Sequence, residues 1–144
     1  MQNLARRNLE RTGLASRVEL KLRDIGEGLD ETDADAFFLD VPNPYDLLSQ
    51  VRQSIKPGGF LCTVVPTFNQ VEKTLIALRQ NTFAFVEVCE ILLRYYKVEP
   101  ARLRPVDRMV AHTAFLIFGR RVEKGSDPRA MELLEEQGVD RGPS

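Results

Sequence analysis

Residues 36–45 read AFFLDVPNPY, a short apolar run that ends at a carboxylate and continues into two prolines. A continuous apolar run of this length is typical of a strand covered on both faces, as in α/β proteins. Pro42 and Pro44 exclude a helix directly after the run, because proline lacks an amide hydrogen and restricts the residue before it. The sequence therefore predicts a buried strand over residues 36–40 that holds Asp40 at its end, before a stiff loop.

Periodicity assigns the rest of the chain to further strands and helices. Strand, helix, strand, helix and then two strands predict an open, mostly parallel α/β sheet whose last two strands form an antiparallel edge. The expected elements are the end of a helix (1–14), strands (18–22, 36–40, from 60, 83–98 and 114–118), helices (45–55 and 69–80) and a KPGG turn (56–59).

One domain is expected over residues 1–122, since 144 residues with 43% hydrophobic content suit a single core. Residues 123–144 carry a short helical pattern, AMELLEEQ, but end in GVDRGPS. This tail is expected to be disordered or frayed.

Composition excludes several classes of site. Twenty basic and 21 acidic side chains give a net charge of −1, so nucleic-acid binding would need a local patch. Two cysteines and one histidine are too few for a disulfide framework, a cysteine zinc site or a histidine-rich metal site. No apolar run reaches the roughly 18 residues of a membrane span, and the first residues do not resemble a secretory signal. We expect a cytoplasmic protein without a metal.

Ligands of open α/β sheets bind at the carboxyl ends of the strands. The expected strands end at Asp24, Asp40 and Pro66, which would line one rim of a crevice. For Asp24, a turn or helix N-cap role is an equal alternative. Asp40, between an apolar run and two prolines, is harder to explain in that way.

Five motifs resemble one family, in order from about Leu4 to Arg121: LRDIGEGL, FFLDVPNPYD, IKPGGFLCTVVPTFNQV, VEVCEILLRYY and RPVDRMVAHTAFLIFGRR. Together they look like the second half of the S-adenosylmethionine-dependent tRNA (adenine-N1)-methyltransferases that modify adenosine 58 of the T-loop. The resemblance implies a Rossmann-like class I methyltransferase sheet truncated at its N-terminus, without the first two strands. It also implies S-adenosylmethionine as cofactor, tRNA as partner, and a homo-oligomer, a tetramer in relatives.

The resemblance implies roles for individual residues. Asp24 would accept a hydrogen bond from the adenine amino group of the cofactor, with Ile25 beside the ring. Asp40 would lie near the methionyl end of the cofactor and the target base, where it would hold the N6 amino group or remove its proton. The substrate base would meet a further set of residues: Pro42, Asn43, Pro44, Tyr45, Asn69 and Gln70.

Three features of the sequence each allow two interpretations. Asn69 is equally suited to cap the helix that it begins. His112 suits a general base, although a hydrogen-bonded structural role is favoured for a single histidine entering a buried strand. A set of arginines predicts either a tRNA phosphate patch or a solvated face or subunit contact: Arg102, Arg104, Arg108, Arg120 and Arg121.

The family binds its cofactor through a glycine-rich turn and an acidic residue that ends the second strand. Gly26 and Gly28 lack the later glycine of such a turn, so we do not assign them to it. We expect a truncated product or C-terminal fragment that starts inside the helix after the second strand. Two other functions stay open: a same-fold methyltransferase with a protein or small-molecule substrate, and an inactive remnant that associates with another subunit through its apolar edge and VEVCEILLRYY.

Overall fold

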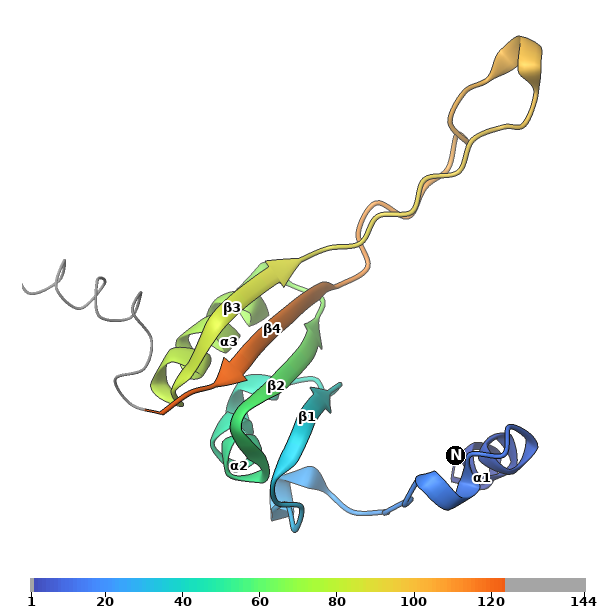
Figure 1. Cartoon of the computed structure of the whole chain (residues 1–144). Helices are drawn as coiled ribbons and strands as arrows, with labels where there is room; N and C mark the ends of the chain where they lie inside the picture. The colour runs from blue at the N-terminus through green and yellow to red at the C-terminus, as the bar shows by residue number, and fades with distance from the viewer. Residues whose placement is uncertain (1, 124–144) are drawn as a thin grey trace, which may run out of the picture.

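The computed structural model describes residues 2–123, which form a four-stranded sheet with helices against it (Figure 1). The strands are β1 (Ala34–Leu39), β2 (Ile55–Val65), β3 (Phe83–Cys89) and β4 (Phe115–Arg121), and the helices are α1 (Gln2–Arg11), α2 (Leu48–Ser54) and α3 (Phe68–Gln80). The sheet order is β1-β2-β4-β3. β1 and β2 are parallel, whereas β4 is antiparallel to both of its neighbours. The predicted α/β class and the antiparallel last pair of strands are confirmed.

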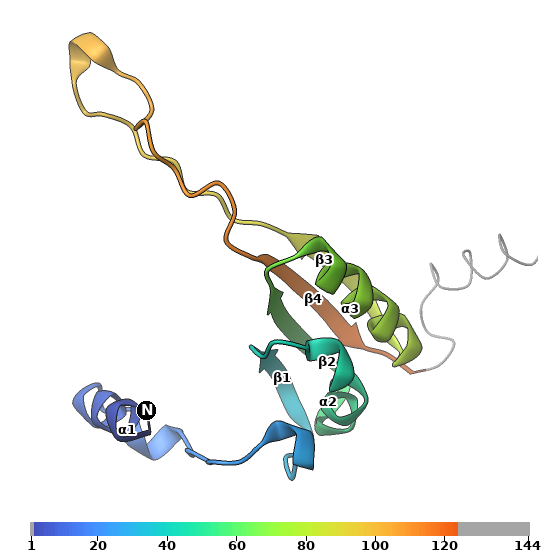
Figure 2. The same cartoon turned by 180° about the vertical axis from the view of Figure 1, so that it is seen from behind.

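Helices α2 and α3 cover the same face of the sheet (Figure 2). Each turns an apolar stripe toward the strands, with Leu48 and Val51 buried on α2 and Val71 and Leu78 on α3. Fully burying a side chain of this size contributes about 1.5–3 kcal/mol, so this layer supplies the main stabilising contact. The other buried apolar residues of the core are Leu39, Ile55, Leu61, Val65, Ala77, Phe83, Phe115 and Ile117.

The KPGG segment forms a bulge between the first two strands. Ile55 pairs with Ala34 and Phe60 pairs with Ala36, so four residues of β2 stand opposite one residue of β1. Gly59 has no room for a side chain, because a Cβ atom there would lie 2.5 Å from Cγ2 of Ile55. The predicted turn is therefore present, although the strand assignment continues through it.

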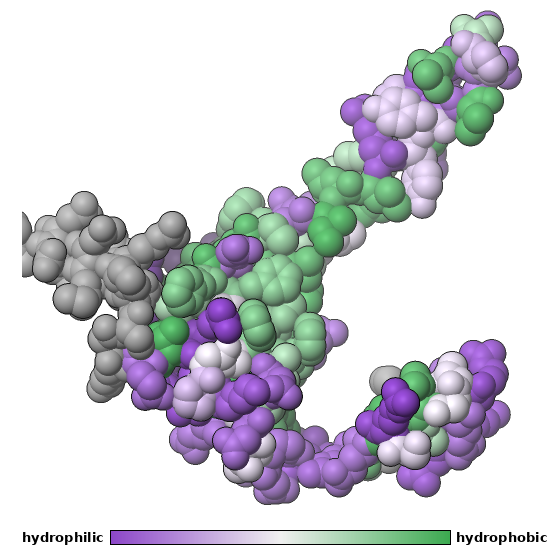
Figure 3. Space-filling model, viewed as in Figure 1, coloured by the Kyte–Doolittle hydropathy of each residue, from purple (hydrophilic) through white to green (hydrophobic). Residues whose placement is uncertain are grey.

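Two expectations about strands are wrong. Residues 18–22 form no strand: Val18 is extended, with φ −128° and ψ 122°, but no described residue pairs with this segment. A period-2 pattern favours extended backbone, yet a strand also needs a neighbour for its amides and carbonyls. β1 is not covered on both faces either. Phe38 is 79% exposed, because alternation points it away from the face that α2 and α3 cover. Figure 3 shows a broad apolar surface over the sheet.

The predicted strand over residues 83–98 ends early, at Cys89. Residues 90–114, here called the arm, project beyond the sheet and return to β4 (Figures 1 and 2). An isolated bridge joins Tyr96 to Pro105. Two backbone hydrogen bonds also cross between the outgoing and returning segments, Lys97 to Arg104 and Val106 to Tyr95. The apolar residues in the segment 90–98 therefore belong to an exposed arm and not to the sheet.

The predicted tail, residues 123–144, lies outside the described residues except for Glu123. The predicted single domain over residues 1–122 stays a prediction.

Hydrogen exchange tests the unpaired segment. The amides of residues 18–22 are expected to exchange quickly, because no ladder of hydrogen bonds protects them. The amides of β2 and β4 are the internal control, since each of these strands pairs on both sides. Protection of residues 18–22 as strong as that of β2 would contradict the expectation.

Candidate functional site

The carboxyl ends of β1 and β2 meet at one edge of the sheet because the two strands are parallel. Leu39 pairs with Thr63. The buried Thr63 hydroxyl also donates a 2.8 Å hydrogen bond to the Leu39 carbonyl. This bond fixes the last residue of β1, so Asp40 and Pro66, which follow the two strands, lie at the same rim.

Asp40 is exposed at this rim. Among residues 2–123, no side chain or backbone group forms a hydrogen bond or ion pair with its carboxylate. An ionised carboxylate offers two acceptor oxygens and no donor. Asp40 is therefore available to accept N–H groups from a ligand.

The loop 41–45 is held in place by α3. The Gln70 side chain donates a 2.9 Å hydrogen bond to the Pro42 carbonyl, and its own oxygen accepts a 2.7 Å bond from the Thr67 hydroxyl. Pro44 is buried and begins the 3₁₀ turn η3 (Pro44–Asp46). Gln70 thus joins the start of α3 to the loop that follows Asp40.

Thr67, and not Asn69, is the N-cap of α3. The Thr67 hydroxyl accepts a 3.4 Å hydrogen bond from the backbone N–H of Gln70. Of the two alternatives for Asn69, the one in which it caps this helix is therefore wrong. The signal was present in the sequence, because Thr67 and Gln70 have the spacing of a capping box. Asn69 is exposed in the first turn.

Tyr45 and Asn43 brace the same loop. The Tyr45 hydroxyl donates a 2.8 Å hydrogen bond to Oδ1 of Asn43. The Lys73 ammonium lies 5.3 Å from the centre of the Tyr45 ring, within the range of a cation–π contact. Sequence reasoning missed Lys73, although it lies one turn after Gln70 on α3 and so on the same helix face.

Asp24 and Ile25 lie apart from this cluster. Oδ1 of Asp24 accepts a 2.8 Å hydrogen bond from the Gly26 amide and caps the 3₁₀ turn η2 (Ile25–Glu27). This contact is the one expected if Asp24 acts as a turn or N-cap residue, the alternative to a ligand-binding role. In both views η2 lies at the level of the start of β1, away from the end that leads to Asp40 (Figures 1 and 2). The structure therefore brings Asp40, the loop 41–45 and Gln70 together, and leaves Asp24 and Ile25 elsewhere.

A hollow of about 390 Å³ lies beside Ile25, with Leu29 and Phe37 as apolar lining. Its polar side consists of Glu19, Lys21, Arg23 and Glu31, and the Lys21 ammonium lies 2.9 Å from the Glu31 carboxylate. The hydrogen bond from the Lys21 ammonium lowers the pKa of the Glu31 carboxyl to about 2. The charges around this hollow are therefore already paired with one another.

His112 accounts for two contacts at the root of the arm. Its Nε2 lies 2.8 Å from the Pro66 carbonyl oxygen, and its Nδ1 pairs with the Glu90 carboxylate. The Pro66 carbonyl raises the pKa of His112, and Glu90 raises it further. These contacts agree with the hydrogen-bonded role favoured from the sequence.

The five arginines of the predicted patch do not form one surface. Arg102, Arg104 and Arg108 lie in the arm, whereas Arg120 and Arg121 end β4 at the opposite end of that strand. Arg120 stacks 4.5 Å from the Phe60 ring centre and donates to the Gly58 carbonyl. Arg121 donates to the backbone carbonyls of residues 52 and 55. The last two arginines therefore hold the fold, and the basic residues of the arm remain exposed.

Two kinds of feature are absent from residues 2–123. No helix in this part of the chain is long and apolar enough to cross a membrane. The same residues contain no group of three or more histidine, cysteine, aspartate or glutamate side chains that could hold a metal ion.

Solved structures show that this is the fold of S-adenosylmethionine-dependent methyltransferases. A structure described as a SAM-dependent O-methyltransferase from Thermotoga maritima is 50% identical, with a TM-score of 0.80, over 87% of this chain and 47% of its own. The tRNA (m1A58) methyltransferase TrmI from Aquifex aeolicus is 38% identical, with a TM-score of 0.73, over 83% of this chain and 48% of its own.

The sequence family is narrower than this fold. The model of the tRNA methyltransferase complex GCD14 subunit matches residues 1–114, so the chain belongs to that family. A curated relative, the tRNA (adenine(57)-N(1)/adenine(58)-N(1))-methyltransferase TrmI of Methanocaldococcus jannaschii, is 31% identical over 69% of this chain and 36% of its own length. The chain thus spans between a third and a half of the length of these relatives.

Substitutions at Gln70 separate its two contacts. Gln70→Glu keeps an oxygen for the Thr67 hydroxyl but loses the N–H that binds the Pro42 carbonyl. We expect amide exchange in residues 43–47 to become roughly 2- to 10-fold faster, the effect of losing one hydrogen bond of about 0.5–1.5 kcal/mol. Exchange at the start of α3 should stay unchanged.

Gln70→Ala is the matched comparison, because it removes both contacts and should speed exchange in the loop and in the first turn of α3. If Gln70→Glu left residues 43–47 as protected as in the parent chain, Gln70 would not be the tether of this loop.

Proposed function

We propose that this chain is part of a tRNA (adenine-N1)-methyltransferase and that its rim receives adenosine 58 of the T-loop. The observation that carries the proposal is the exposed carboxylate of Asp40 directly after β1, which has no partner among residues 2–123 and lies beside a loop fixed by Gln70. The family match and the relatives named for this reaction support it.

In this reaction the rim has two tasks, which are to position the base and to stabilise charge. S-adenosylmethionine, when bound, supplies an electrophilic methyl group. Asp40 would accept a hydrogen bond from the N6 amino group of adenine and so hold the base in a fixed orientation. The same carboxylate would stabilise positive charge on the adenine ring or accept the N6 proton. Pro42 and Pro44 keep the loop rigid around the base.

The described residues fit the cofactor only in part. Asp40 would suit its cationic sulfonium end. The apolar side of the hollow beside Ile25, formed by Leu29 and Phe37, would suit a flat ring such as adenine, and Asp24 would be the nearby hydrogen-bond acceptor. These two places do not share a rim in this structure. No step is therefore derived through the cofactor, and the binding roles of Asp24 and Ile25 stay proposals.

We propose the remaining base contacts as follows. Pro42 and Asn43 shape the pocket, and the amide of Asn43 faces the base while its oxygen binds Tyr45. Tyr45 and Gln70 hold the loop, and Asn69 reaches the pocket from the exposed first turn of α3. The place of action is the cytoplasm, where tRNA is available.

A methylation assay tests the function. The complete natural protein that carries this chain is incubated with labelled S-adenosylmethionine and an unmodified tRNA transcript. We expect label in the tRNA and a primer-extension stop at position 58, because a methyl group on N1 blocks base pairing. A transcript with another base at position 58 is the control.

A second candidate has one specific observation in its favour, since the Thermotoga maritima structure is described as an O-methyltransferase. Label that enters a protein or small molecule with a free hydroxyl, and never enters tRNA, would favour that reaction and contradict our proposal.

Asp40→Ala in the complete protein is expected to lower turnover by about 100-fold or more, the effect of losing one preorganised polar contact of about 2.7–4 kcal/mol. The fold should survive, because Asp40 is exposed and has no partner among residues 2–123. Asp40→Asn keeps an acceptor oxygen without the charge, so it separates positioning from electrostatics. Normal single-turnover rates in Asp40→Ala would remove this residue from the mechanism.

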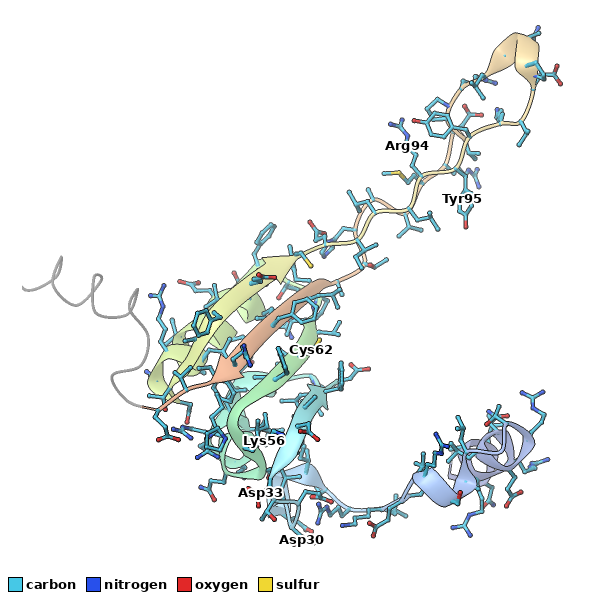
Figure 4. All side chains as sticks on the ribbon, in the orientation of Figure 1. Asp30, Asp33, Lys56, Cys62, Arg94 and Tyr95 are labelled. Carbon is cyan, nitrogen blue, oxygen red and sulfur yellow. The ribbon has the colours of Figure 1, made fainter. Side chains whose placement is uncertain are left out.

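We also propose that the protein is a homo-oligomer that associates through the arm. The arm exposes several large apolar side chains, including Leu93 at 65% and Val98 at 97%. Arg94 and Tyr95 project from it in Figure 4. Because few hydrogen bonds join its two segments, its backbone is open to pairing with a second copy.

Sedimentation tests this assembly. A Leu93→Glu, Val98→Glu double variant should sediment as a smaller species, because the charges cannot enter an apolar contact. Lys97→Gln, a polar change on the same segment, should leave the assembly intact. An unchanged oligomer in the double variant would place the subunit contact outside the arm.

A further inference from the structure

His112 stands where three segments meet. The Pro66 carbonyl comes from the connection between β2 and α3, Glu90 begins the arm, and His112 lies near the end of the arm. The His112 ring also packs 4.8 Å from the ring centre of Phe115, which lies 4.6 Å from Phe68 at the start of α3. Both segments of the arm and the start of α3 are therefore joined through this one side chain.

The partners of the ring determine its protonation state. The Pro66 oxygen belongs to a backbone carbonyl and the Glu90 oxygens belong to a carboxylate, so both partners act as acceptors. Satisfying both requires an N–H on each ring nitrogen, and only the imidazolium has two. A neutral ring would keep one of these bonds and turn a lone pair toward the other acceptor.

A short chain of contacts leads from His112 to the candidate site. Pro66 immediately precedes Thr67, the N-cap of α3, and the Thr67 hydroxyl binds Gln70. Gln70 in turn holds the Pro42 carbonyl, two residues after Asp40. We propose that His112 is a positioning residue of the methyl-transfer site: as an imidazolium it clamps the root of the arm to Pro66 and so sets the arm relative to the loop 41–45. The role of His112 in methyl transfer rests on the proposed function. The contacts that form the clamp do not depend on that function.

The clamp has a defined pH dependence. The pKa of His112 in the folded protein lies above its ordinary value of 6.5, because the Pro66 carbonyl and Glu90 favour the charged ring. The stabilisation is therefore complete below the ordinary pKa and is lost as the pH rises through the raised pKa. Glu90 is the titratable group in contact with the ring among the described residues, and α3 and β4 contribute the apolar rings of Phe68 and Phe115.

The sequence allows a direct experiment, because His112 is the single histidine of the chain. Its imidazole signals can be followed by NMR as the pH is raised. We expect two protonated nitrogens at low pH, a titration midpoint above 6.5, and a shift of the Gln70 side-chain amide with the same midpoint. A midpoint at or below 6.5, or a Gln70 amide that does not follow it, would overturn the inference.

Three variants sharpen this test. Glu90→Gln removes the charge beside the ring and should shift the midpoint downward. His112→Phe keeps a ring beside Phe115 but has no hydrogen-bond donor. In this variant the NMR signal of the Gln70 side-chain amide should no longer shift with pH. Lys97→Gln is the control, because it breaks an ion pair farther along the arm, in which Nζ of Lys97 lies 2.7 Å from Oδ2 of Asp107. This variant should leave the His112 midpoint unchanged. A midpoint that moved equally in Lys97→Gln and Glu90→Gln would contradict a local clamp.

Activity separates this inference from the proposed function. In the complete protein, tRNA methylation should slow as the pH rises through the His112 midpoint, and His112→Phe should be slow with no such inflection. Loss of tRNA methylation in every form, with the NMR result intact, would refute the function and leave the clamp standing. An active enzyme whose rate has no inflection at that midpoint would refute the positioning role alone.

Discussion

The parallel pairing of β1 with β2, closed at its end by the hydrogen bond from Thr63 to the Leu39 carbonyl, is the constraint from which the site follows. Parallel strands end at the same edge of a sheet, so Asp40 and Pro66 emerge side by side. The loop 41–45 and helix α3 then begin from neighbouring points, close enough for Gln70 to reach Pro42. Loosening this pair would separate every contact of the rim at once.

The polar groups of the rim fall into two kinds. Thr67, Gln70, Asn43 and Tyr45 satisfy one another or the backbone, so they give the loop its shape. Asp40 has no such partner among the described residues. A carboxylate kept free beside a rigid, internally satisfied loop is preorganised for a ligand, since little must rearrange when the ligand arrives.

Local patterns in the sequence were enough to locate β1, α2 and α3, because an apolar run followed by prolines and a helical stripe each define their own element. They failed where an element depends on a distant neighbour. The alternating pattern of residues 18–22 does not indicate whether another strand lies beside this segment. Residues 90–98 have the composition of a strand, although they do not join the sheet. The strand order predicted a rim with Asp24, Asp40 and Pro66, of which Asp24 lies elsewhere, and the resemblance alone placed Gln70 beside it. The contact of Lys73 with Tyr45 was not predicted, because that contact joins a loop to the next helix in space.

The position of β4 has a consequence for how the chain is made. β4 comes last in the sequence among the described strands, yet it lies between β2 and β3, and β3 pairs with no other strand of residues 2–123. During synthesis, β3 and the arm must leave the ribosome before the strand that anchors them exists. Contacts between such distant residues close slowly. Until residue 121 is free, the nascent chain exposes an unpaired edge on each of β2 and β3, the period in which a chaperone would be needed most.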